Sequence, residues 1–259
     1  MDSEESLPIL KKAYDLGVTT WDTANTYSNG ESERVIAKAI KTYNLHREEL
    51  VIMTKCFFSV KKEGDSATFG FADPNTKEYC NTMGLSRAAI FNAVNDSLER
   101  LEMDYIDDPN VEPEEVMCAL NDLVRSGKVR YIGASSMWAY QFATYQHVAE
   151  MNGWTKFVPM QNLYNALYRE EELELKFQRP VDYPAGQEIV KRIEGLAKKH
   201  GWTMTEVALA WINEKITSPI VGANSIKRLE DTVRASNLQL SADEVSYISE
   251  PYVALPITR

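Results

Sequence analysis

Segments of strand type and of helical type alternate along most of this 259-residue chain. Short β-branched or apolar runs are each followed by an amphipathic stretch with apolar residues three or four positions apart. Repeated strand–helix units place parallel strands in one sheet and cover that sheet with helices, so the alternation predicts an α/β fold. The predicted strands are 18–22, 50–54, 103–106, 129–133, 157–160 and 219–222.

The predicted helices share apolar positions on one face and end near Gly or a polar turn. Ser86 and Ser225 stand where side-chain caps are expected. No shift in composition marks a boundary, so we expect a single domain over 1–259. The longest predicted loop, 57–85, follows a strand, where long loops tend to carry function. The helices are 6–16, 31–40, 86–101, 112–125, 137–151, 187–199, 205–214, 225–235 and 242–249.

Composition excludes several classes of protein. The chain is 44% hydrophobic and 25% charged, as expected of a globular protein with a core. Its net charge of −10 argues against nucleic acid or an anionic membrane as a partner. No apolar run reaches transmembrane length, and the acidic N-terminus lacks the apolar core of a signal peptide, so we expect a cytoplasmic protein. Three cysteines without a CxxC or Cys/His cluster indicate neither a disulfide framework nor a metal site.

Asp22, Tyr27 and Lys55 follow two successive predicted strands. A phenol donates a proton near neutral pH only if its pKa is lowered from about 10. A neighbouring ammonium does this, and a carboxylate can hold that ammonium in place. Taken singly, a capping Asp, a core Tyr and a surface Lys are the commoner readings. Their joint position at the carboxyl ends of strands suggests a carbonyl-reducing site.

Three further strand ends carry groups that could bind a cofactor. Ser135 follows one strand, where capping is the alternative, and Gln161 follows another, where a local turn is the alternative. Ser225 and Arg228 open a predicted helix whose backbone N–H groups could hold a phosphate; a solvated arginine is the alternative. The histidines lie in helical or helix-edge contexts typical of surface positions, namely His46, His147 and His200.

Four segments, 7–30, 84–107, 127–136 and 159–168, resemble the aldo-keto reductases. The resemblance is greatest to the fungal branch that includes aryl-alcohol dehydrogenases and versiconal hemiacetal acetate reductase. It implies a (β/α)8 TIM-barrel fold that binds NADP(H) across its carboxyl mouth. It also implies a small-molecule carbonyl substrate, aromatic or polyketide-derived, in secondary metabolism.

The resemblance also implies roles for individual residues. Tyr27 would be the general acid, Lys55 the neighbour that lowers its pKa, and Asp22 the partner of Lys55 and a contact of the cofactor. The nicotinamide carboxamide would be held by Ser135 and Gln161, and the 2′-phosphate side of the cofactor by Ser225 and Arg228. Two positions depart from the usual family residues, Ser136 in place of Asn and Gly222 in place of a phosphate-binding Lys.

Compared with the family, this sequence lacks buried strands. It begins at the helix that follows the first barrel strand. It passes from Asp107 to Asp108 without the end of the fourth strand and its catalytic His, and it lacks the seventh strand near 173–179. An incomplete gene model, a partial sequence or a truly shortened protein would each produce this pattern, and the intact motifs beside both junctions favour the first two.

Two classes of function therefore remain. The intact Asp22, Tyr27 and Lys55 favour an NADP(H)-dependent carbonyl reductase. The absent strands favour a catalytically impaired relative that binds a cofactor or a partner without turnover. A third possibility is a chain that does not fold alone.

Overall fold

The structure, a computed structural model, describes residues 3–61, 77–79, 81–104, 113–169 and 180–254. It is an α/β arrangement of helices and short parallel strands, and it divides into two compact units, Met1–Gln161 and Asn162–Arg259.

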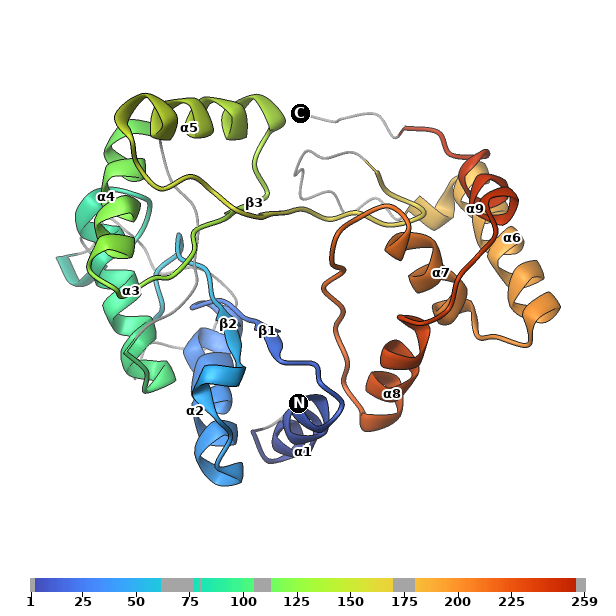
Figure 1. Cartoon of the computed structure of the whole chain (residues 1–259), viewed down its shortest axis with the longest axis horizontal. Helices are drawn as coiled ribbons and strands as arrows, with labels where there is room; N and C mark the ends of the chain where they lie inside the picture. The colour runs from blue at the N-terminus through green and yellow to red at the C-terminus, as the bar shows by residue number, and fades with distance from the viewer. Residues whose placement is uncertain (1–2, 62–76, 80, 105–112, 170–179, 255–259) are drawn as a thin grey trace. The chain divides into compact units, whose positions relative to one another are not determined.

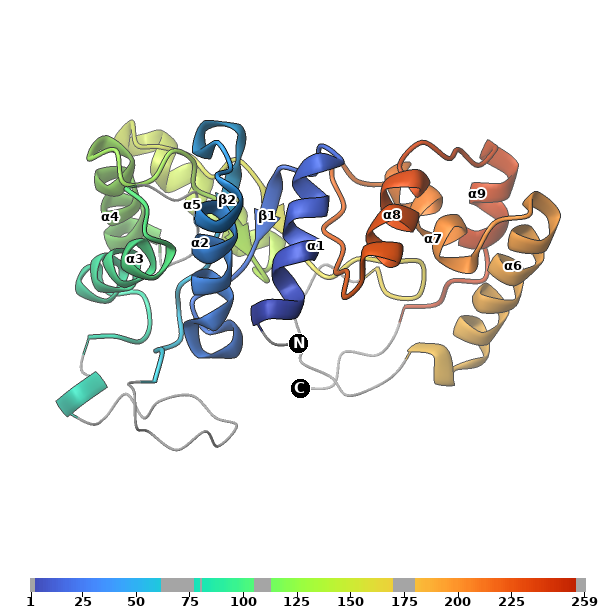
Figure 2. The same ribbon diagram turned by 90° about the horizontal axis from the view of Figure 1, so that it is seen from below.

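The first unit contains short strands, short 3-10 turns and five α-helices among its described residues (Figure 1). Helices α1 and α2 lie side by side, as Figure 2 shows. Its elements are α1 (Ser3–Asp15), β1 (Thr20–Asp22), η1 (Tyr27–Gly30), α2 (Glu31–Tyr43), η2 (Arg47–Glu49), β2 (Val51–Met53), η3 (Lys77–Tyr79), α3 (Arg87–Leu101), α4 (Pro113–Arg125), β3 (Ala134–Ser135), α5 (Ala139–Asn152) and β4 (Met160–Gln161).

The strands of the first unit form two parallel pairs among the described residues. In the first pair, β1 lies beside β2 with Asp22 opposite Met53. In the second, β3 lies beside β4 with Ser135 opposite Gln161. Parallel pairing brings the carboxyl ends of both strands of a pair to the same edge, so the polar residues that follow them become neighbours.

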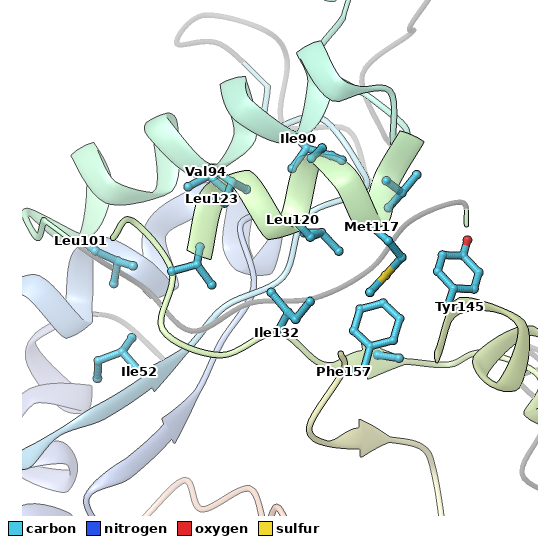
Figure 3. Close-up of a cluster of buried hydrophobic side chains, with 14 of the residues drawn as sticks. Ile52, Ile90, Val94, Leu101, Met117, Leu120, Leu123, Ile132, Tyr145 and Phe157 are labelled. Carbon is cyan, nitrogen blue, oxygen red and sulfur yellow. The ribbon is translucent and has the colours of Figure 1, made fainter. Parts of the chain in front are cut away.

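The core of the first unit lies between the strands and helices α3, α4 and α5 (Figure 3). Helical spacing places apolar residues of α3 and α4 on facing stripes, and alternation places one residue of each strand toward them. Burial of these side chains removes apolar surface from water, which is the main stabilising contribution to such a unit. The fully or almost fully buried members include Ile52, Ile90, Val94, Leu101, Met117, Leu120, Leu123, Ile132 and Phe157.

The second unit contains η4 and four helices among its described residues. Apolar faces of α6, α7 and α9 meet around Trp211, whose indole Nε1 donates to Ser249 Oγ at 3.0 Å. Two of the helices begin with reciprocal caps, in which Thr203 pairs with Glu206 and Ser241 pairs with Glu244. The elements are η4 (Pro180–Asp182), α6 (Pro184–His200), α7 (Met204–Asn213), α8 (Ile226–Ala235) and α9 (Ala242–Ser249).

The predicted strands differ from the observed ones more than the helices do. The predicted strand 219–222 is wrong, because those residues have no regular structure and expose Ile220 and Val221. The predictions 129–133 and 157–160 are displaced toward the C-terminus, where β3 and β4 lie, although Val158 N already donates to Ile132 O at 2.8 Å. Of the predicted strand 103–106, Met103 and Asp104 are not in a strand, and 105–106 lie outside the described residues.

The two junctions where strands were predicted to be absent also lie outside the described residues, at 107–108 and 173–179. Of the predicted long loop 57–85, the described part carries only the short turn η3. Ser86 caps α3 and Ser225 caps α8, so both predicted caps are confirmed.

Candidate active site

The pairing of β1 with β2 brings Asp22 and Lys55 together. The ladder continues past both strands, because Thr23 N donates to Met53 O at 2.8 Å and Asn25 N donates to Lys55 O at 3.1 Å. Lys55 Nζ donates to both oxygens of Asp22, at 2.8 and 2.7 Å, and to the backbone oxygen of Thr23 at 2.8 Å. The lysine and aspartate side chains are 20% and 11% exposed, so water screens this ion pair less than a surface pair.

Tyr27 lies on the turn that follows β1. Lys55 Nζ is 5.3 Å from the centroid of its ring, within the range of a cation–π contact. The turn is tight, because Ser28, Asn29 and Gly30 all have positive φ, a conformation that Asn and Gly tolerate better than most residues. Tyr27 is 48% exposed, so its phenol is accessible to a small molecule while its ring stays beside the ammonium.

Side-chain amides tie this turn to the residues that follow β2. Asn25 Nδ2 donates to Phe58 O at 2.9 Å. Asn29 bonds Lys61 twice, as an acceptor from its N–H at 2.7 Å and as a donor to its oxygen at 3.0 Å. These contacts fix the turn against the segment that carries Lys55. These side-chain contacts of Asn25 and Asn29 were not predicted from the sequence, where the detectable signal was a carboxamide on each side of Tyr27.

Gln161, at the end of β4, reaches the ion pair. Its Nε2 donates to Asp22 Oδ2 at 3.3 Å, which is a long hydrogen bond. Ser135 lies opposite Gln161 in the parallel pair, and its Oγ is 3.4 Å from the Oγ of Ser136. The structure thus brings Asp22, Lys55, Tyr27 and Gln161 into one neighbourhood of the first unit, and Ser135 beside Gln161.

The other predicted binding residues lie in the second unit. Ser225 Oγ accepts from Arg228 N at 3.3 Å and caps α8, while Arg228 Nη1 donates to Asn224 Oδ1 at 3.1 Å. A helix N-terminus with a hydroxyl and a guanidinium fits a phosphate group. In the first unit, the Ser135 hydroxyl and the Gln161 amide fit a carboxamide.

A cavity of about 720 Å³ opens beside the Tyr27 turn. Its described lining includes Asn25, Asn29, Thr82 and Arg100, but neither Asp22, Tyr27 nor Lys55. We place the candidate site at the Asp22–Lys55–Tyr27 group rather than in this cavity, because that group carries the acid–base chemistry.

The histidines lie at surface or boundary positions, as predicted: His46 precedes η2, His147 is exposed on α5, and His200 is half-buried at the end of α6. Over the described ranges, no group of three or more His, Cys, Asp and Glu residues is placed to hold a metal ion. No helix in the described part of the chain is both long and apolar enough to cross a membrane.

Comparison with known proteins shows which family this chain is similar to. The model of the aldo/keto reductase family matches residues 1–177 and, in a second match, residues 168–252. An aldo-keto reductase of Metarhizium robertsii is 44% identical over 308 residues, which cover 98% of this chain and 83% of the relative. A provisionally named aryl-alcohol dehydrogenase of Schizosaccharomyces pombe is 41% identical over 307 residues, covering 99% and 87%. Versiconal hemiacetal acetate reductase of Aspergillus parasiticus is 38% identical over 303 residues, covering 98% and 88%.

These alignments are longer than the chain itself. Each extends over more than 300 residues, whereas the chain has 259. The relatives therefore contain internal residues that have no counterpart in this sequence.

Proposed function

This chain belongs to the aldo/keto reductase family, and we propose that it reduces the carbonyl group of an aldehyde or ketone to an alcohol with NADPH as cofactor. The observation that carries the proposal is the placement of Lys55 Nζ, which is held by Asp22 and the Thr23 oxygen and lies 5.3 Å from the Tyr27 ring centroid. A phenol next to a fixed cation is the arrangement that protonation of a reduced carbonyl requires.

Tyr27 is the proposed proton donor. As the carbonyl carbon gains a hydride, its oxygen becomes an alkoxide, and the Tyr27 O–H gives that oxygen its proton. The phenolate that remains recovers a proton from water, so one carbonyl gains one hydride and one proton. Such general-acid assistance contributes about 10²–10⁴-fold to the rate.

Lys55 and Asp22 support this transfer. The ammonium of Lys55 stabilises the negative charge that develops on the phenol oxygen. Asp22 accepts two of the hydrogen bonds of Lys55 and so fixes the ammonium beside Tyr27 rather than letting it extend into water.

Five residues would hold the cofactor. Ser135 and Gln161 would bind the nicotinamide carboxamide, Asp22 would contact the same part of the cofactor, and Ser225 and Arg228 would bind its 2′-phosphate. When bound, NADPH supplies the hydride. The capped N-terminus of α8 and the Arg228 guanidinium support the choice of NADPH over NADH.

The substrate class is proposed from the relatives. Their names include an aryl-alcohol dehydrogenase and a versiconal hemiacetal acetate reductase. We therefore place the substrate among aromatic or polyketide-derived carbonyl compounds, such as those of secondary metabolism.

For the fold, we propose a single (β/α)8-type barrel domain from which the seventh strand and the end of the fourth strand are absent. The family supports the barrel, and the lengths of the alignments support the absence of internal segments.

The test is NADPH oxidation in the presence of a panel of aryl aldehydes, measured for the wild type and for Tyr27→Phe. We expect the variant to lose about 10²–10⁴-fold in kcat, because phenylalanine keeps the ring and removes the proton. Tyr140→Phe, at an exposed tyrosine on α5, is the matched control and should leave the rate unchanged. Equal rates for wild type and Tyr27→Phe would contradict the role of Tyr27.

A second candidate is a binding protein that holds the cofactor without turnover. It is favoured by the gaps in the alignments and by the helix-edge positions of the histidines, none of which follows a strand. Submicromolar NADPH binding with no oxidation on any aldehyde of the panel would support this candidate over the reductase.

A further inference from the structure

A buried ion pair contacts the segments that carry the Asp22–Lys55–Tyr27 group. Glu33 on α2 is fully buried, and its Oε2 accepts from Arg100 Nε on α3 at 2.6 Å. The Arg100 side chain is only 10% exposed, and its Nη2 donates to Ser97 Oγ at 3.1 Å. A fully buried carboxylate is rare unless it is paired, and here it is paired with an arginine of the neighbouring helix.

The same carboxylate binds the strand segment that carries Lys55. Thr54 Oγ1 donates to Glu33 Oε1 at 2.6 Å, and Thr54 is almost completely buried. Both oxygens of Glu33 are therefore used, one by Arg100 and one by Thr54. Since Thr54 immediately precedes Lys55, the bond fixes the backbone from which the ammonium extends.

Arg100 also supports the turn that carries Tyr27. A Cβ built on Gly30, the last residue of that turn, would lie 2.8 Å from Arg100 Cδ. Gly30 has a φ of 88°, a conformation that other residues adopt only with strain. The turn that begins at Tyr27 thus ends directly against the aliphatic part of Arg100.

The Glu33–Arg100 pair therefore contacts both sides of the candidate site. Glu33 contacts the Lys55 segment through Thr54, and Arg100 contacts the Tyr27 turn through Gly30. A buried ion pair is weak evidence for stability, because desolvation of both charges offsets their attraction, and a hydrophobic pair of similar volume is often as stable. The best-attested contribution of a buried ion pair is to fix one arrangement of the segments that it joins. We propose that Glu33 and Arg100 are positioning residues that set the distance between Lys55 and Tyr27.

The catalytic consequence of this inference depends on the proposed reductase activity, whereas its structural consequence does not. The test therefore has two readouts. The first is kcat and KM for an aryl aldehyde with NADPH. The second is the ¹⁵Nζ–proton NMR signal of Lys55, assigned by its loss in Lys55→Met and measured without cofactor.

Two variants separate positioning from stability. Thr54→Val keeps the volume of the side chain and the ion pair, but removes the bond to the Lys55 segment. The double variant Glu33→Leu/Arg100→Met removes both charges together, so no unpaired charge is left buried. Thr155→Val is the matched control, because Thr155 likewise loses a hydroxyl bond, to Asn121 Oδ1, but contacts neither Glu33 nor Arg100 through it.

We expect both test variants to lower kcat by about tenfold or more with KM nearly unchanged, because misplacement of an acid affects the reaction step more than binding. We expect the Lys55 signal to shift or broaden in both, and to remain in place in Thr155→Val. Folded variants with wild-type kcat and an unchanged Lys55 signal would overturn the proposal. If the double variant does not fold, Thr54→Val decides by the same criteria.

A wild type that oxidises no NADPH with any aldehyde would instead refute the reductase function. The NMR comparison would then still decide whether Glu33 and Arg100 position Lys55.

Discussion

Glu244 provides a test of how charge stabilises the second unit. Its Oε1 accepts from Lys199 Nζ at 2.8 Å and lies 2.7 Å from His200 Nε2, and its Oε2 accepts from Ser241 N at 3.0 Å. The pKa of Glu244 is lowered to about 2. The hydrogen bond from Lys199 is the largest cause, and the hydrogen bond from the Ser241 backbone is the next largest. These contacts join α9 to the end of α6.

The direction in which pH changes the stability follows from the pKa of Glu244 in the folded and unfolded states. In the unfolded chain the Glu244 carboxyl titrates near its ordinary pKa of about 4.3, so the unfolded state binds the proton more tightly. The stabilisation is complete above about pH 5 and is lost as the pH falls from there through about 2. A shift of this size corresponds to about 3 kcal/mol. Lys199 is mostly exposed, and screening by solvent therefore reduces the contribution to about 2 kcal/mol at pH 7.

The measurement is urea unfolding of wild type and Glu244→Gln between pH 2 and 7, followed by ¹⁹F NMR of 5-fluorotryptophan. Among the five tryptophans, Trp202 and Trp211 report on the second unit. We expect Glu244→Gln to lower the free energy of unfolding by about 2 kcal/mol at pH 7 and by nearly nothing near pH 2.

Glu194→Gln is the matched control, in the same unit and with the same substitution. Glu194 pairs with Lys198 at 2.6 Å across an exposed helical turn. Exposed pairs of this kind contribute little to stability, so the control should unfold nearly as the wild type does. A Glu244→Gln curve that equals wild type at pH 7, or a difference that persists undiminished at pH 2, would refute the reasoning.

Three further predictions concern the strands, helix α6 and the cofactor. Gly133→Ala should lower stability by about 1–3 kcal/mol, measured as a drop in Tm, because its Cβ would lie 2.6 Å from Pro159 Cγ and 2.9 Å from Pro159 O. Gly195→Ala on α6, where a Cβ meets nothing within 4 Å, should instead raise stability by about 0.5–1 kcal/mol. Arg228→Ala should weaken NADPH binding by about tenfold and leave NADH binding unchanged, measured by fluorescence titration; equal losses for both cofactors would contradict a 2′-phosphate contact.

The helices could be predicted from the sequence because their signals are local. The predicted bounds of α9, 242–249, agree with the structure, and the caps at Ser86 and Ser225 form the expected side-chain bonds. Helical hydrogen bonds and caps connect residues only a few positions apart, so periodicity and capping residues contain most of the information.

The strands could not be predicted as well because a strand exists only with a partner. The run at 219–222 is apolar enough for a strand, but it remains irregular and partly exposed. The run at 129–133 pairs from Ile132 onward, where Val158 N donates to Ile132 O and Ala134 N donates to Pro159 O. Pairing joins distant segments, which a local pattern does not identify.

For the candidate site, the sequence determined which groups are available: the residues that follow successive strands are Asp22, Tyr27 and Lys55, and parallel pairing places such residues at one edge. Only the tertiary structure decided how they are held. It brought the Thr23 oxygen to Lys55, Asn29 to Lys61, and a buried Glu33 from an otherwise apolar helix face to Arg100 and Thr54. The reason is physical, since chemical type is a property of each residue, whereas burial and hydrogen-bond partners are properties of segments far apart in the chain.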